Sequence, residues 1–355
     1  MFAKKNLVAA AALLAMAGAA QADVKLYGSL DAGFGTVENA HAKNASTRTT
    51  QVTSGSMMTS FIGFAGSEDL GNGLKAEFAL ESFLANDTGA NVPNLANGFW
   101  SRASNVALSG NFGKVSLGQT DNPLFTSGYT YNPFGSSMTF SPTMRHFYST
   151  DYAALGFDTG WVNSITYESP IVQGFSGVLQ FAPKESTAAG MNNSYAAAVS
   201  YNNGPISATL NYEKGGRSTA VGSVTAYRAD QKVWDLGASF DFGAAKAFAQ
   251  YTTVKTSSYY NATGPAVVTD TNGAKATIYQ VGVSVPVTDK ASVLASYGAA
   301  KFKDNVTAAQ TDRVFSLGVD YFLSKRTDVY AAFANNTATD LASGQTALLG
   351  IKHAF

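Results

Sequence analysis

The chain has 355 residues, no cysteine, and 24 basic against 24 acidic residues, so its formal net charge is zero. This balance argues against nucleic acid or a strongly charged molecule as a partner, and the lack of cysteine excludes disulfides and thiolate metal sites. The mean hydropathy of -0.02 is too low for a helical membrane protein. After residue 22, no apolar run reaches the roughly 18 residues of a membrane-spanning helix.

The first 22 residues predict an export signal. Lys4 and Lys5 precede an apolar run that ends at Ala20, and Ala20-Gln21-Ala22 is a small-residue cleavage pattern. We expect cleavage after Ala22, which leaves residues 23–355 as the mature chain. Removing the two lysines changes the balance from 24 against 24 to 22 basic against 24 acidic residues.

Strand-like alternation with one apolar face recurs along the mature chain. Between residues 74 and 81 the even positions are apolar, whereas Lys75, Glu77 and Glu81 share the opposite face. The same division recurs over residues 315–321. Small, hydroxylated and charged side chains on the second face favour a water-filled interior over a packed core.

Short and long connections alternate between these strands. Seven tight, Gly-, Asn-, Asp- and Pro-rich turns are predicted at 67–72, 110–113, 170–174, 202–204, 242–244, 287–290 and 324–326. Eight longer loops are predicted near 38–55, 85–98, 121–158, 184–192, 215–230, 257–274, 302–310 and 338–344. We therefore predict an all-β fold: one closed antiparallel transmembrane β-barrel of about sixteen strands, with short periplasmic turns and long extracellular loops. Closure is expected because each unpaired backbone group at an open sheet edge in lipid costs several kcal/mol.

The last strand-like run, residues 350–355, ends in Phe355. A terminal aromatic after alternating residues is typical of a final barrel strand whose aromatic girdle meets the membrane interface. We expect Phe355 to act as a C-terminal barrel signal. The cell outer membrane is the expected location of this multi-pass barrel.

Separated segments of the chain resemble one known family. They are the sequences at residues 26–33, 66–76, 167–170, 323–327 and 350–355. Through them the chain resembles the trimeric general porins of Gram-negative bacteria, in particular the beta-proteobacterial branch. The resemblance implies a homotrimer of sixteen-stranded barrels that contacts outer-membrane lipid and lipopolysaccharide. It also implies recognition of the C-terminal strand by the barrel-assembly machinery, and a third long loop folded into each lumen.

The third long loop, residues 121–158, is the expected constriction loop. Its Asn132-Pro133-Phe134-Gly135 stands where such porins carry a Pro-Glu-Phe-Gly-like motif, so the usual acid is missing. Between Asn122 and Thr150 there is no Asp or Glu. The residues of this segment expected to line the constriction are Asp121, Phe125, Tyr129, Tyr131, Pro133, Phe134 and Arg145.

In general porins the wall that faces this loop carries a row of basic residues. This chain has fewer basic residues at those positions. Phe61 and Gln119 stand at basic positions of the family pattern, Ser29 stands at a position that is lysine in some porins, and Arg102 is retained. Alternation from Val106 would place Arg102 in the hydrocarbon, at a cost of roughly 2–4 kcal/mol. The resemblance favours the lumen instead, so we expect a bulge or a place at the rim.

Four charged residues complete the expected pore lining: Asp31, Lys75, Glu77 and Glu81. Asp31 is interpreted either as a structural link to neighbouring wall residues or as an ion contact. Lys75, Glu77 and Glu81 are interpreted as paired wall charges or as part of a selectivity filter.

The combined pattern predicts an outer-membrane porin, a water-filled channel for passive diffusion of small hydrophilic solutes and ions, without a cofactor. Two forms of the channel fit the sequence. One has a weakly charged, aromatic-lined eyelet of low ion selectivity, and the other is an ordinary general porin whose charges stand at other positions. An adhesin acting through its long loops, and a soluble secreted sandwich, are alternatives of different classes.

Catalysis and metal binding have little support. The only histidines are His41, His146 and His353, and no Gly-x-Ser-x-Gly elbow is present. No His or Cys cluster suggests a metal. Gly71-Asn72-Gly73 lacks the spacing of a nucleotide-binding loop, so we interpret its glycines as turn residues.

Overall fold

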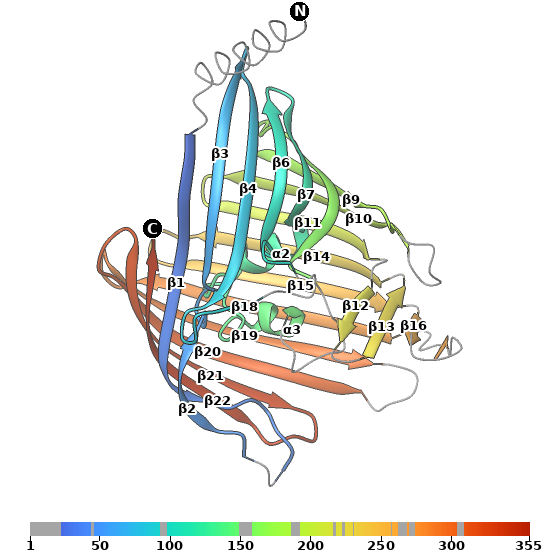
Figure 1. Ribbon diagram of the computed structural model, residues 1–355. Coiled ribbons are helices and arrows are strands. Elements are labelled where there is room, and N and C mark those ends of the chain that lie inside the picture. Colours follow the sequence, from blue (N-terminus) through green and yellow to red (C-terminus); the bar gives the residue numbers. More distant parts are fainter. Residues whose placement is uncertain are drawn as a thin grey trace, which may run out of the picture.

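The computed structural model describes residues 23–43, 46–92, 98–148, 158–185, 192–215, 218–221, 224–229, 231–256, 258–261, 268–269, 274–303 and 309–355. The predicted export signal and its cleavage site lie outside the described residues. Most of the described chain forms one large antiparallel sheet that curves into a barrel (Figure 1).

The main sheet contains 18 strands, of which β2 (Thr49–Ser54) and β5 (Ala90–Asn91) are short additions, so sixteen form the barrel. The barrel strands are β1 (Asp23–Val37), β3 (Phe61–Gly71), β4 (Leu74–Ala85), β6 (Ala103–Gly110), β7 (Gly113–Asp121), β8 (Gly160–Glu168), β9 (Phe175–Ala182), β10 (Ser194–Asn203), β11 (Ile206–Gly215), β14 (Gln231–Asp241), β15 (Lys246–Thr256), β18 (Ala274–Pro286), β19 (Ala291–Lys303), β20 (Gln310–Phe322), β21 (Thr327–Ala338) and β22 (Gly344–Ala354). Each pairs with its neighbours in chain order, which confirms the predicted sixteen-stranded fold.

The barrel closes where its first strand meets its last. β1 pairs with β22 from Ser29 opposite Ala354 to Thr36 opposite Ala347. Phe355 extends this seam, because its backbone N–H donates to the Gly28 carbonyl at 3.1 Å and its own carbonyl accepts from Gly28 at 3.3 Å. Because β1 and β22 pair, neither presents an open edge to lipid.

Side chains alternate between the two faces as the sequence predicts. On β20, Phe315, Leu317 and Val319 are 43–46% exposed on the outer face, whereas Ser316 between them is fully buried on the inner face. Exposed apolar side chains on an outer face suit hydrocarbon, and small polar ones leave room for water inside.

Three predicted connections differ in detail. β3 continues through residues 67–71, so the first turn is only Asn72-Gly73, both with positive φ. β2 lies inside the predicted 38–55 loop and pairs with the second half of β1, whereas β3 pairs with the first half. The predicted loops at 215–230 and 257–274 contain a separate four-stranded sheet of β12 (Ser218–Val221), β13 (Val224–Ala229), β16 (Ser258–Asn261) and β17 (Val268–Thr269).

Two short helices of the third long loop lie inside the barrel (Figure 1). α2 (Pro123–Thr130) begins after Asn122, whose side chain accepts a hydrogen bond from the Phe125 backbone N–H, and Pro123 at the first position suits a helix start. α2 packs against β10, β11 and β14, and α3 (Pro142–Tyr148) packs against β18, β19 and β20. No helix in the described ranges is both long and apolar enough to cross a membrane.

Glycines on the inner wall let this loop approach the strand backbones closely. Gly237, Gly282, Gly298 and Gly318, here called the docking glycines, lie under Tyr131, Pro133, Pro142 and Phe134 respectively. An added Cβ would lie 2.5 Å from a Pro133 ring carbon at Gly282, 2.5 Å from Pro142 at Gly298, and 3.0 Å from Phe134 at Gly318. The loop thus rests on backbone where a larger residue would displace it.

Gly282→Ala should therefore push the third loop away from the wall. We expect a loss of about 1–3 kcal/mol in the free energy of unfolding, as for other overpacked contacts, and a lower single-channel conductance, because the displaced loop moves into the lumen. Urea titration and planar-bilayer recording measure the two effects.

Gly177→Ala is the matched control, because an added Cβ there meets nothing closer than 3.5 Å. Wild-type stability and conductance in Gly282→Ala would show that the loop does not rest on this glycine.

Candidate pore constriction

Hydrogen bonds between the third loop and the wall hold α2 in place. The Leu124 backbone N–H donates to Glu213 of β11 at 2.9 Å, and the Ser127 hydroxyl donates to Asp235 of β14 at 2.5 Å. Gln280 of β18 then donates to the Tyr131 carbonyl at 3.1 Å. Because these wall side chains are almost fully buried, each needs such a partner to offset its desolvation.

A second set of contacts anchors α3. His146 Nε2 lies 3.0 Å from Asp312 Oδ2 of β20, and both side chains are buried. Arg145, 5% exposed, donates from Nη2 to the Asn39 side-chain oxygen at 2.8 Å, which links the third loop to the first. The expected pore-lining residue Arg145 thus lies within a contact between loops.

Most aromatic side chains of the loop pack inward rather than facing water. Phe125, Tyr131 and Phe134 are 7%, 3% and 2% exposed. Phe125 makes edge-on contacts with Tyr129 and Tyr148 at centroid distances of 5.3 and 5.5 Å. This differs from the expectation of an aromatic-lined eyelet, because rings that would be costly to hydrate instead cover the docking glycines and the loop interior.

Arg102 contacts side chains of β3 and β4. β6 begins only at Ala103, so the alternation counted back from Val106 does not extend to Arg102. Its Nη1 forms an ion pair with Glu81 of β4, and its guanidinium carbon lies 4.2 Å from the centre of the Phe61 ring. The Tyr27 hydroxyl also donates to Glu81.

Among the other expected wall residues, Glu77 and Gln119 are also held by neighbours. Lys114 pairs with Glu77 at 3.3 Å, and the Gln119 side chain donates to the Ser101 carbonyl at 2.6 Å. Ser29 is 3% exposed on β1. Lys75 is exposed on β4, next to Ser109 of β6 across the sheet.

Asp31 makes a structural link. One carboxylate oxygen accepts from the backbone N–H groups of Met57 and Met58 at 2.5 and 2.8 Å, and the other accepts from the Tyr330 hydroxyl at 2.8 Å. These bonds tie the break between β2 and β3 to β1 and β21. Since Asp31 is fully buried, this geometry favours the structural interpretation over an ion contact.

Sequence reasoning missed several inward acids, namely Glu168, Glu213, Asp235 and Asp312. Their signal was available, because Glu213 and Asp235 stand on the polar face of alternating strands. The sequence alone does not distinguish acids that bind the third loop from other polar residues of the inner wall, because it does not show which strands the loop covers.

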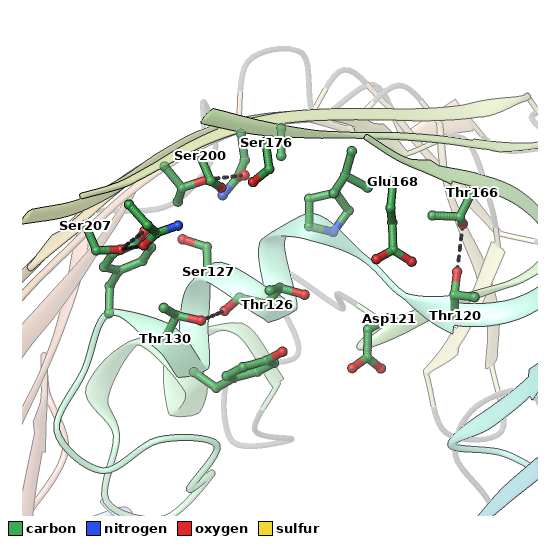
Figure 2. Close-up of a pocket in the computed structure, with 18 residues that line it drawn as sticks. Thr120, Asp121, Thr126, Ser127, Thr130, Thr166, Glu168, Ser176, Ser200 and Ser207 are labelled. Carbon is green, nitrogen blue, oxygen red and sulfur yellow. Dashed lines mark hydrogen bonds between the residues drawn. The ribbon is translucent and has the colours of Figure 1, made fainter. Parts of the chain in front are cut away.

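A cavity of about 420 Å³ lies between α2 and the wall formed by β7 to β11 (Figure 2). Asp121, Glu168, Tyr129 and Tyr131 are among its lining residues. Burial raises the pKa of the Tyr129 hydroxyl, and the carboxylates of Asp121 and, more weakly, Glu168 add to this rise, while Arg102 opposes it. Tyr129, which lines the cavity, therefore lies within the electrostatic field of both acids.

The sequence profile of Gram-negative porins matches residues 9–341. The chain belongs to the Gram-negative porin family. It is 33% identical over 382 aligned positions to outer membrane porin protein 32 of Delftia acidovorans, covering 99% of this chain and 100% of that one. It is 34% identical over 203 positions to a major outer membrane protein P.IB of Neisseria gonorrhoeae, covering 56% and 54% of the two chains.

Solved structures show the same relationship. The anion-selective porin from Comamonas acidovorans matches with a TM-score of 0.75 and 29% identity, over 94% of this chain and 100% of that one. The family and the closed barrel confirm that this porin is an outer-membrane channel protein. The comparisons give the adhesin alternative no support.

The pairing of Arg102 with Glu81 predicts opposite effects from its two partners. Arg102→Ser should shift the reversal potential in a salt gradient toward cation preference, because it leaves the Glu81 carboxylate without its cation. Glu81→Gln should shift it toward anions. Each removed charge acts on a nearby ion with roughly 1–4 kcal/mol at about 4 Å.

Arg326→Ser, which removes an exposed cation in a short turn, is the control. Shifts of the same sign in the two variants, or none, would mean that the pair does not act on permeating ions.

Proposed function

We propose that this porin is a diffusion channel of low ion selectivity for small hydrophilic solutes. The observation that carries the proposal is the pairing of three lumenal cations with neighbouring acids. Arg102 pairs with Glu81, Lys114 with Glu77 at 3.3 Å, and Lys352 with Asp328 at 2.8 Å.

Pairing weakens the field that an ion meets. A single charge acts over about a Debye length, near 8 Å at physiological salt, whereas two opposite charges in contact largely cancel beyond their own separation. A constriction built from such pairs still presents polar groups to solutes, but it distinguishes anions from cations weakly.

The comparison with an anion-selective relative makes the proposal specific. The Comamonas structure is named as anion-selective, and an unpaired arginine row would favour anions here too. In this chain Arg102 is offset by Glu81, and Phe61 and Gln119 occupy basic positions of the family pattern. We therefore expect a weaker anion preference than that name implies.

Among the candidate site residues, we assign the constriction to Arg102, Glu81 and Phe61 on one wall and to α2 with Tyr129 on the other. Phe61 begins β3, Glu81 lies on β4 and Arg102 immediately precedes β6, whereas α2 packs mainly on β10, β11 and β14. The opening between them is the proposed passage, and the remaining candidates support its walls.

We further propose a homotrimer that contacts outer-membrane lipid and lipopolysaccharide, assembled through the C-terminal strand and exported by a signal cleaved after Ala22. Porin family membership supports these assignments. An OmpT of Vibrio cholerae with the same fold is named as a trimer form.

The proposed function includes no bond chemistry. His146 is paired with Asp312, His353 contacts the Thr327 hydroxyl, and His41 contacts the Asn39 carbonyl, so each has a structural partner. Within the described ranges, no group of three His, Asp or Glu side chains could hold a metal ion.

Reversal potentials and solute permeation test the proposal together. In a salt gradient across a planar bilayer, the purified porin should give a potential near zero. In liposome swelling, neutral sugars, zwitterionic amino acids and carboxylates of matched size should enter at similar rates. A large potential of either sign, or carboxylates far faster than neutral solutes, would contradict low selectivity.

A further inference from the structure

The cavity beside α2 has a composition unlike the rest of the lumen. Half of its eighteen lining residues are Ser or Thr, supplied by α2 and by strands β7 to β11. Several of these hydroxyls bond to each other, as between Thr120 and Thr166 at 2.7 Å and between Ser200 and Thr209 at 2.9 Å. Each hydroxyl can both donate and accept, so the wall retains capacity for a polar ligand.

The charges of the cavity all have one sign. Asp121 and Glu168 line it, and no Lys, Arg or His does. Figure 2 shows both carboxylates directed into the space beside α2. Among the described residues, neither carboxylate has a hydrogen-bond or ion-pair partner, in contrast to Glu77 and Glu81, which are paired with cations.

A buried amide at the edge of the cavity gives an independent indication of a missing ligand. Gln180 of β9 is 3% exposed, and its amide nitrogen donates to the lining hydroxyl of Thr120 at 2.9 Å. Its carbonyl oxygen accepts no hydrogen bond from any described residue. A buried acceptor left in this way costs about 1–3 kcal/mol unless water or a solute supplies a donor.

We propose that this cavity is a binding site for a small hydroxylated amine, such as a protonated amino sugar or amino alcohol. The inference rests on the proposed channel function, since the ligand reaches the site from the lumen. The ammonium group is held by Asp121 and Glu168, and the ligand hydroxyls bond to the Ser and Thr wall. The volume of about 420 Å³ lies within the usual range for small-molecule sites.

The composition favours this class over simpler ligands. A neutral sugar would satisfy the hydroxyl wall but leave two carboxylates without an ion-pair partner. A bare cation would satisfy the carboxylates but leave the hydroxyls and the Gln180 carbonyl without donors. The charge of Arg102 also acts on Asp121, but Arg102 forms its ion pair with Glu81 on the other side of the passage and not with Asp121.

Solute-induced block of the ion current tests this site. Glucosamine, N-acetylglucosamine, glucose and methylammonium are added in turn to the purified porin in planar bilayers, and the concentration for half-maximal current reduction is measured. Glucosamine should block at the lowest concentration. Asp121→Asn with Glu168→Gln should weaken its block about tenfold or more, as expected for lost hydrogen bonds to charged groups.

The control is Asp289→Asn, which removes one carboxylate from an exposed turn and should leave the block unchanged. Equal block by glucosamine and N-acetylglucosamine would overturn the role of the ammonium group. Equal block by glucosamine and methylammonium would overturn the role of the hydroxyl wall. Open channels that no solute blocks would refute this site alone, whereas protein that never conducts would refute the channel function itself.

Discussion

The structure depends on one constraint: backbone N–H and C=O groups in hydrocarbon must find partners within the chain. A sheet meets this constraint only by closing, so β1 must pair with β22. Closure then fixes which face of every strand meets lipid. The alternation of the sequence follows from that division, with large apolar residues outside and small or polar residues inside.

The same reasoning applies to the polar groups enclosed by the barrel. A loop inside the lumen brings buried backbone and side chains that must be hydrogen-bonded, or their desolvation cost would expel it. Glu213, Asp235, Gln280 and Asp312 supply those partners from the wall. Several inward acids therefore hold the third loop in place, and fewer charges remain to act on permeating ions.

The sequence allowed the barrel, its strand number and most of its turns to be predicted, because period-two alternation and turn residues are local signals. The constriction was harder to predict. An irregular loop has no sequence period to show which side of Phe134 meets the wall. The ring fits there because Gly318, which is distant in the sequence, has no side chain. Arg102 was ambiguous because it stands one residue before β6. Its pairing with Glu81 depends on contacts between strands, which the alternation of one strand does not contain.

Single-channel recording tests the central claim most directly. The folded porin, inserted into a planar bilayer, should produce discrete, long-lived current steps whose size increases with salt concentration, as expected for a water-filled lumen narrowed by a docked loop. Folded and inserted protein that passes no current would contradict the account, because a sealed interior cannot serve as a diffusion channel.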